Sequence, residues 1–275
     1  MNSNLGTPEL VLSRVQKTFP TRHGELNALK DITFDVREGE FVCLVGPSGC
    51  GKSTLLNLIA GLDRQDSGSI LLDGKPVSGP GPDRVVVFQE GALCPWMSVA
   101  QNIDYGLKIK KINVEERRRI TERYLKMVHL DKFAHSFIHE LSGGMRQRVA
   151  IARALALEPR ILLMDEPFNA LDTQTRDLLV EELRAIWSKI GNTVLFITHN
   201  VREAVYLADR IVLLSFRPGR VREIFKIDLP RPRDPDHAHL EEIVRSIVQQ
   251  LHEEVEKELP DFISLAYDGL KIIMK

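Results

Sequence analysis

The stretch FVCLVGPSGCGKSTLLNLIAG, residues Phe41 to Gly61, decides the fold of this chain. It begins with an apolar run that ends in glycine, as a buried strand does, and it ends in a helical run. Between the two, GPSGCGKST matches the phosphate-loop pattern G-x-x-x-x-G-K-[ST]. In such a loop, backbone N–H groups and the positive N-terminus of the next helix converge on phosphate oxygens. The expected ligand is therefore a nucleoside triphosphate.

Individual residues of this loop have distinct expected roles. Lys52 supplies a point charge for the β- and γ-phosphates, and the Ser53 hydroxyl is placed to ligate Mg²⁺. Cys50 is expected to contribute its backbone N–H; a thiol beside Lys52 can have a lowered pKa, in which case alkylation would block nucleotide binding. The predicted nucleotide-binding residues of the loop are Gly46, Pro47, Ser48, Gly49, Cys50, Gly51, Lys52, Ser53 and Thr54.

An acidic pair follows a second apolar strand, ILLMDE, at Ile161 to Glu166. The carboxyl ends of parallel strands form the edge of an α/β sheet where ligands bind. Asp165 is predicted to hold Mg²⁺ directly or through water, and Glu166 to polarise or deprotonate the attacking water. Alone, the two acids could equally well cap the next turn, but beside a phosphate loop they indicate a P-loop NTPase.

The composition sets limits on the class of protein. The chain has 275 residues, 43% of them hydrophobic, with Lys plus Arg 37 against Asp plus Glu 38. This balance lacks the basic excess of nucleic-acid binders, so no nucleic-acid partner is expected. No apolar run approaches the ~18 residues of a membrane span, and the start lacks a secretory signal. Three cysteines without metal-like spacing favour a cytoplasmic protein with reduced thiols.

Hydrophobic periodicity predicts an α/β protein with a mainly parallel core sheet, because strands and helices alternate along the second half of the chain. The first ~75 residues read mostly as strand, with Asp73-Gly74 as a hairpin turn. RVVVFQ, residues 84–89, is predicted as a buried strand, and residues 90–158 have helical periodicity. Further strands are expected at 193–198 and 210–215.

Capping signals place several helices. Asn113 with Glu116, and Asn200 with Glu203, are predicted capping boxes. A helix from Asp172 to Ile190 should stop at Gly191. LPRPRDPD, residues 229–236, is a linker by composition, and a helix with apolar residues at helical spacing follows it. That helix, assigned to residues 237–259, could pack on this domain, on a second copy or on another subunit.

A second glycine-containing motif, LSGGMRQR at Leu141 to Arg148, also looks like a phosphate site. Ser142 is the expected N-cap, followed by Gly143 and Gly144 with bare N–H groups. The surroundings of Lys52 in the same chain are already filled by the sheet, so the motif would serve a neighbour in a two-fold dimer. From spacing and chemistry alone, a phosphate site for a neighbouring copy and an ordinary glycine-containing helix start are equally good interpretations.

The ordered set of motifs resembles the ATP-binding-cassette (ABC) family across Val11 to Leu229. LSGGMRQRVAIARAL is similar to its signature motif; the others are GPSGCGKST, VVFQ ending at Gln89, ILLMDEPF, NALD at Asn169 to Asp172, and FITH ending at His199. The family's last loop usually begins with serine, and here Asn169 stands there. The resemblance implies an ABC cassette over residues 1–229. It has an N-terminal antiparallel β subdomain and a helical subdomain inserted at about 90–158; residues 230–275 form a linker and a C-terminal helical extension.

The same resemblance implies roles for single residues. Phe19 would stack on adenine, Gln89 would contact Mg²⁺ or the attacking water, Glu166 would be the catalytic carboxylate and His199 the γ-phosphate sensor. Without the family pattern, a lone histidine after a strand is more often structural. The residues expected to act on the opposite subunit's ATP are Ser142, Gly143, Gly144 and Asp172.

Three functions compete: the ATPase of a membrane importer, a soluble cassette acting on DNA or ribosomes, and a P-loop small-molecule kinase. A kinase has no need of LSGG in trans, and a soluble cassette usually needs a long coiled-coil insertion or two cassettes. The transporter reading implies ATP, Mg²⁺, a second copy, a permease touching Gln89 to Trp96, a substrate-binding protein, and a peripheral position on the cytoplasmic membrane face. Trp96 could instead simply be buried. PWMSVAQNI, NALD and LPRPR look most like the nitrate, sulfonate and taurine importer group, although export is not excluded.

Overall fold

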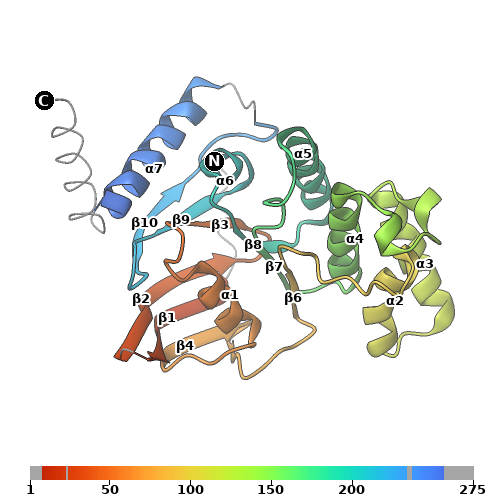
Figure 1. Ribbon diagram of the computed structural model, residues 1–275, viewed down its shortest axis with the longest axis horizontal. Helices are drawn as coiled ribbons and strands as arrows, with labels where there is room; N and C mark the ends of the chain where they lie inside the picture. Colours follow the sequence, from red (N-terminus) through yellow and green to blue (C-terminus); the bar gives the residue numbers. More distant parts are fainter. Residues whose placement is uncertain (1–7, 23, 234–236, 257–275) are drawn as a thin grey trace, which may run out of the picture.

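Figure 1 shows the computed structural model of the chain, which describes residues 8–22, 24–233 and 237–256. The chain folds around a six-stranded sheet in the order β10-β9-β3-β8-β7-β6. Its strands are β3 (Phe41–Val45), β6 (Arg84–Val87), β7 (Ile161–Asp165), β8 (Thr193–Ile197), β9 (Arg210–Leu214) and β10 (Val221–Lys226). All neighbouring pairs are parallel except β9 and β10. The carboxyl ends of β3, β6, β7, β8 and β9 therefore meet at one edge of the sheet.

A second, antiparallel sheet comes from the N-terminal part of the chain, in the order β2-β1-β4-β5. Its strands are β1 (Pro8–Thr21), β2 (Gly24–Arg37), β4 (Ser67–Leu72) and β5 (Lys75–Pro76). Asp73 and Gly74 join the last two strands with positive φ angles of 49° and 70°, which confirms the predicted hairpin turn.

The two faces of the central sheet bury two separate hydrophobic cores. Val42 and Leu44 of β3 point toward the antiparallel sheet and helix α1 (Lys52–Ala60). Cys43 and Val45 point to the opposite face, which the other helices cover. Because both faces are covered, β3 and β8 are buried along their whole length, as the apolar run FVCLV predicts.

Helices α2 (Val99–Ile109), α3 (Val114–Met127) and α4 (Gly143–Ala156) form a group at one end of the molecule, beyond β6 (Figure 1). They occupy the predicted helical stretch 90–158, together with two short 3₁₀ helices at Asp131–Phe133 and Ile138–Glu140. Asn113 accepts from the N–H of Glu116 at 2.9 Å at the start of α3, so it is the N-cap, but the Glu116 carboxylate bonds Arg119 and the reciprocal half of the predicted capping box is not formed. Helices α5 (Thr173–Ile190) and α6 (Val201–Leu207) follow β7 and β8, with Asp172 as N-cap and Gly191 as C-cap of α5.

Two further predictions about the elements are wrong in part. The strand at 84–89 ends at Val87, and since β6 is an edge strand it is mostly half-buried rather than buried. Asn200 accepts from the N–H of Glu203 at 3.3 Å, but the Glu203 carboxylate bonds the Thr198 hydroxyl, and Asn200 donates its own N–H to Thr198 at 3.0 Å. The reciprocal half of that capping box is therefore replaced.

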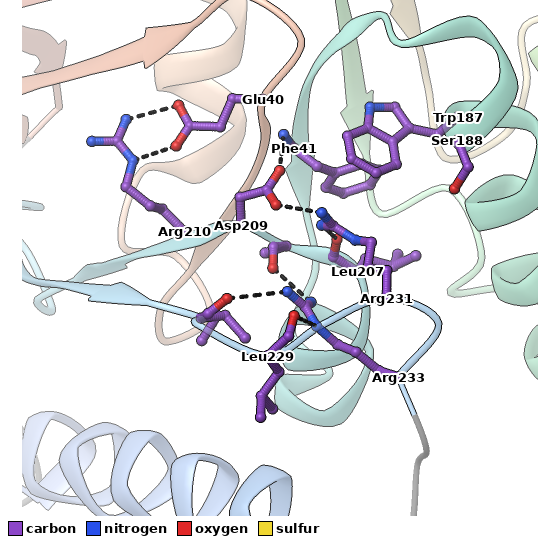
Figure 2. A network of polar contacts seen from close by, with 12 residues as sticks. Glu40, Phe41, Trp187, Ser188, Leu207, Asp209, Arg210, Leu229, Arg231 and Arg233 are labelled. Carbon is purple, nitrogen blue, oxygen red and sulfur yellow. Dashed lines mark hydrogen bonds and ion pairs between the residues drawn. The ribbon is translucent and has the colours of Figure 1, made fainter. Parts of the chain in front are cut away.

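The segment predicted as a linker is an anchor in its described part. Arg233 is only 5% exposed, and its guanidinium donates to the carbonyls of Val205, Tyr206 and Ala208 at 2.6–3.0 Å (Figure 2). These carbonyls end α6, where a cation is favoured by the helix dipole. Burial, followed by the charge of Arg231, lowers the pKa of Arg233 to about 10.

Arg231 completes this arrangement, which we call the arginine anchor (Trp187, Asp209, Arg231 and Arg233). Arg231 pairs with Asp209 and lies over the Trp187 ring, with its guanidinium carbon 4.4 Å from the ring centroid. Asp209 also accepts from the N–H of Phe41 at 2.9 Å (Figure 2). The arginine anchor therefore fastens the chain after β10 to α5, α6 and the start of β3.

Helix α7 (Ala238–Glu256) packs on this same domain, alongside β10 and α6 (Figure 1). Leu240, Val244 and Ile247 are buried in the core that the sheet shares with α2–α6, and Arg202 of α6 pairs with Glu241. Of the partners left open by the sequence, this domain is the one on which the described helix packs, from Leu240 to Glu254. The part of the predicted helix after Glu256 lies outside the described residues.

Candidate nucleotide site

The phosphate loop lies between the end of β3 and α1, as the sequence predicts. Gly51 caps α1 with a φ of 102°, and a Cβ there would lie 2.7 Å from Leu29 Cδ2, so only glycine fits. Lys52 is 7% exposed, and its ammonium donates to the carbonyls of Gly46 and Pro47 at 2.9 and 3.0 Å. Both partners are uncharged, so a buried positive charge stands at a helix N-terminus, which suits an anionic phosphate ligand.

The thiol of Cys50 is not activated by its neighbour. It is buried, and a Cβ on Gly46 would lie 2.8 Å from its sulfur. Burial raises the pKa of the Cys50 thiol, and the opposing charge of Lys52 does not outweigh it. The expectation of a lowered pKa is therefore wrong, because desolvation dominates over one nearby ammonium.

Asp165 and Ser53 meet at the carboxyl edge of the sheet. Burial raises the pKa of the Asp165 carboxyl, and the adjacent Ser53 hydroxyl opposes that rise without outweighing it. A partly buried carboxylate beside an alcohol is the kind of oxygen donor set that Mg²⁺ accepts, with water and phosphate oxygens filling its remaining positions. The pair thus fits the ion that the phosphate loop implies.

Glu166 adopts a left-handed conformation, with a φ of 45°, directly after β7. Its N–H donates to the carbonyl of Ile197 at 3.0 Å, which ties it to the end of β8. Its Oε2 lies 3.1 Å from Nδ1 of His199 and accepts from the Asn169 amide at 3.1 Å. The structure therefore brings together Glu166, His199 and the residue that departs from the family pattern. A positive φ at a non-glycine residue is the kind of strain found at functional sites.

A small cavity behind this trio holds a residue that sequence reasoning assigned only to a helix cap. Glu203 is 8% exposed, and burial raises the pKa of its carboxyl to about 7. The cavity is lined by Glu166, Phe168, Asn169, Arg176, Thr198, His199, Asn200 and Glu203. Within the described residues, Oε1 of Glu203 is buried without a hydrogen-bond partner. The sequence signal for this residue was its position in the first turn of α6, which begins two residues after His199 and places Glu203 beside the same cavity.

Gln89 lies at the same edge of the sheet, exposed and two residues beyond the end of β6. Val87 pairs with Met164, so Gln89 and Asp165 follow neighbouring parallel strands. Phe19 is half-buried in β1, opposite Leu26 of β2, and the Lys17 ammonium lies 5.1 Å from its ring centroid. Gln89 and Phe19 are therefore both at least partly exposed, so a ligand can reach them.

The loop after Gln89 presents Trp96, which is 72% exposed, so the alternative of a buried tryptophan is wrong. Asn102, fully buried in α2, holds this loop from beneath. Its amide donates to the carbonyls of Cys94, Met97 and Ser98 at 3.1–3.3 Å and accepts from the N–H of Cys94 at 2.9 Å. Trp96 therefore stands on a loop whose backbone is fixed.

The signature loop occupies a different place from the phosphate loop. Ser142 is exposed and caps α4, accepting from the N–H of Met145 at 3.3 Å. A Cβ on Gly144 would lie 2.8 Å from Thr175 Cγ2 of α5, so α4 and α5 meet closely there. Helix α4 packs in the core on one face of the sheet, whereas α1 packs in the other. Asp172, which caps α5, has a pKa lowered by hydrogen bonds from Thr175.

Two negative findings hold for the described ranges. No helix there is long and apolar enough to cross a membrane. No group of three or more His, Cys, Asp and Glu side chains is arranged to hold a metal ion in residues 8–22, 24–233 and 237–256.

Comparison with known proteins gives consistent matches. Residues 29–169 match the family model described as ABC transporter. An uncharacterised ABC transporter ATP-binding protein of Methanocaldococcus jannaschii is 51% identical over 91% of this chain and 94% of its own length. A nitrate import ATP-binding protein of Synechocystis is 50% identical over 80% of this chain and 83% of its own length, which confirms the resemblance to the nitrate group.

A solved structure agrees with the sequence comparisons. It is a dimeric ATP-binding cassette in a post-hydrolysis state with ADP and Pi, at 35% identity. It superposes with a TM-score of 0.71, over 80% of this chain and 100% of that one. The chain therefore belongs to the ABC transporter family, as an ATP-binding cassette that hydrolyses ATP.

Proposed function

We propose that the chain is the ATPase subunit of a membrane importer, in which two copies close around two ATP molecules and drive a separate permease. One observation carries this proposal: the phosphate loop precedes α1, which packs in one core of the sheet, whereas the exposed, glycine-containing start at Ser142 belongs to α4, which packs in the other core. Each half is accounted for if a second copy supplies the other half. The solved dimeric cassette supports this arrangement.

Within each site, the phosphate loop Gly46 to Thr54 would hold the phosphates, and Phe19 would stack on adenine. Ser53, Asp165 and Gln89 would hold Mg²⁺, which when bound neutralises charge that develops on the phosphate oxygens. In the opposite copy, Ser142, Gly143 and Gly144 would offer a hydroxyl and two N–H groups, and Asp172 would link the two sites.

Glu166 would act as the catalytic base. Its backbone N–H donates to the Ile197 carbonyl, and its Oε2 contacts the Asn169 amide and the His199 ring, so the orientation of the carboxylate is set before the substrate arrives. His199 is exposed enough to reach a phosphate, and in its neutral form it can accept at one ring nitrogen while donating at the other. Proton transfer from water to Glu166 supports in-line attack on the γ-phosphate.

The surface from Gln89 to Trp96 would receive the permease. An exposed tryptophan on a fixed loop is the kind of anchor that dominates protein interfaces. Since Gln89 lies at the edge that carries Asp165, this surface adjoins the proposed Mg²⁺ site. A peripheral position on the cytoplasmic face of the membrane follows from a partner that supplies the pore.

For the substrate, the nitrate import relative favours a small anion such as nitrate, a sulfonate or taurine, delivered by a substrate-binding protein. Neither a nucleic-acid partner nor small-molecule phosphorylation has a comparable feature in its favour.

The deciding experiment measures the mass of Glu166→Gln in solution with and without Mg-ATP. This variant should bind ATP and turn it over slowly, so Mg-ATP should convert monomer to dimer. Ser142→Arg in the same background should abolish dimerisation, because the long cationic side chain blocks the helix start. Lys52→Ala tests binding alone and should lose ATP affinity. A protein that binds ATP yet stays monomeric at high concentration would contradict the shared-site proposal.

A further inference from the structure

We infer that helix α7 holds the phosphate loop in its binding conformation through the turn between β9 and β10, with Glu254 and Arg217 as positioning residues. We call Ser215–Arg220 the β9–β10 turn. The inference rests on the proposed role of the phosphate loop. It adds that α7, about two hundred residues later in the chain, influences the conformation of that loop.

Arg217 is the direct contact between the β9–β10 turn and the phosphate loop. Its Nε donates to the carbonyl of Gly49 at 2.6 Å, a charge-assisted hydrogen bond. Gly49 has a φ of 76°, and a Cβ built there would lie 2.6 Å from Nη2 of Arg217. The guanidinium therefore packs on the side of Gly49 that a side chain would fill.

Gly219 gives the turn a second contact with the loop. A Cβ on Gly219 would lie 2.2 Å from the carbonyl oxygen of Cys50, so the two backbones touch. Gly219 also donates its N–H to Ala28 at 2.9 Å and accepts from the N–H of Lys30 at 2.9 Å. The turn is thus fixed between β2 and the phosphate loop and cannot move without disturbing one of them.

Glu254 joins the same turn to α7. Its Oε2 accepts from the N–H of Phe216 at 2.9 Å, and its Oε1 accepts from Arg222 at 2.6 Å. The residue is 4% exposed although it stands in the last turn of α7, where a negative charge is unfavourable for the helix dipole. A buried carboxylate at that position is explained by what it holds, not by helix stability.

The adjacent residue provides a contrast. Glu253 also pairs with Arg222, and it lies near Gln249 of its own helix, but its side chain is 45% exposed. Of these two neighbouring glutamates, Glu254 has the bond to the β9–β10 turn.

The consequence for binding follows from peptide geometry. The Gly49–Cys50 peptide has its carbonyl held by Arg217, and the Cys50 N–H, which points the opposite way in the same peptide plane, donates to the carbonyl of Pro47 at 3.3 Å. This closes the loop before any phosphate arrives. Without Arg217 or Glu254, part of the binding energy would be spent on ordering the loop, so ATP affinity would fall while the chemical step stayed the same.

The test compares Glu254→Gln with the control Glu253→Gln, which is the same isosteric change at the adjacent residue. It also compares Arg217→Ala with the conservative variant Arg217→Lys. The quantities measured are the Kd of ATP, kcat, KM and the thermal midpoint of the nucleotide-free protein. Arg217→Ala and Glu254→Gln should each raise Kd and KM about 5-fold, as for loss of one partly exposed charged hydrogen bond, with kcat at saturation within about 2-fold. Arg217→Lys should recover part of the affinity, and Glu253→Gln should leave Kd within about 2-fold.

A double variant establishes the pathway. If Glu254 acts through Arg217, adding Glu254→Gln to Arg217→Ala should raise Kd no further. Additive effects, equal effects of the two glutamate variants, or a lowered midpoint with unchanged Kd would each overturn the inference. Lys52→Ala separates the two proposals: retained ATP affinity there contradicts the role of the loop itself, whereas loss there beside unchanged Kd in Arg217→Ala contradicts the positioning alone.

Discussion

The two tryptophans of the chain stand in opposite surroundings. Trp187 packs its ring against Phe41 at 5.6 Å between centroids, carries Arg231 on its face, and donates its indole N–H to Asn192 at 2.8 Å. Trp96 is 72% exposed on the loop after β6. Trp187 belongs to the arginine anchor, and Trp96 belongs to the exposed loop that follows Gln89.

The same contrast runs through the charged groups of both regions. Arg233 meets five backbone carbonyls of its own chain. Glu166, His199 and Ser142 are each held by hydrogen bonds but keep part of their surface open. Polar groups that are buried and paired within the chain stabilise the fold, whereas groups that are fixed yet reachable are prepared for another molecule. The predictions below test that distinction.

Arg233→Ala should have the largest effect. It removes the cation that binds the end of α6 and leaves several buried carbonyls without a donor, so the free energy of unfolding should fall by about 3 kcal/mol. Chemical denaturation measures this. The control is Arg202→Ala. Arg202 lies in α6, the helix whose end Arg233 binds, and its exposed pair with Glu241 should contribute about 1 kcal/mol or less. Equal losses in the two variants would remove the distinction between anchor and surface.

Glu166→Gln should slow ATP turnover ~10²-fold or more, the scale expected for loss of a general base. Because the amide keeps the size of the side chain, ATP affinity and the thermal midpoint should stay near those of the unchanged protein. Steady-state hydrolysis and a binding titration distinguish the two quantities. Turnover close to normal would exclude Glu166 as the base.

Glu203→Gln should alter the pH dependence of stability. The pKa of Glu203 is raised to about 7 in the folded protein from its ordinary value of 4.5, so the folded state holds a proton that the unfolded chain has lost between these pH values. Stability from this group is therefore full below about pH 4.5, falls as pH rises to about 7, and stays low above it, a loss of about 3 kcal/mol.

The variant carries no charge at this position, so its stability relative to the unchanged protein should increase from pH 5 to pH 8. Denaturation at both pH values measures the difference. A difference that is the same at both would mean that Glu203 is ionised throughout.

Trp96→Ala should have the smallest effect on the isolated chain, within about 0.5 kcal/mol of unfolding free energy and with ATP affinity unchanged. Association with the permease should be lost, because the anchor residue is gone. Trp187→Ala is the matched control and should destabilise the chain clearly, since it removes packing from both Phe41 and Arg231. Co-purification of the permease with Trp96→Ala would contradict the docking role.

Much of this contrast can be predicted from the sequence. The apolar run FVCLV and the loop after it predict β3, the phosphate loop and α1, because burial and glycine conformation leave few alternatives there. The N-caps Asn113 and Ser142 were also predicted correctly, since capping is local.

What the sequence does not disclose depends on distant contacts. β10 was missed for a different reason, because none of its residues is fully buried and its hydrophobic pattern is weak, although its partner β9 is near in sequence. LPRPR has the composition of a linker, and only the end of α6, more than twenty residues earlier, explains its arginines. The pKa of Cys50 depends on its burial, which no local pattern conveys.

Asn102 has a consequence for how this surface can change over evolution. One buried side chain in α2 satisfies the backbone of the loop from Cys94 to Ser98, so the shape of the loop does not depend on the side chains it displays. Substitutions at Trp96 and Met97 can then change the exposed chemistry of this surface while the hydrogen bonds from Asn102 stay in place. If the surface receives the permease, as proposed, a cassette of this design can acquire a new partner by small steps without losing its fold.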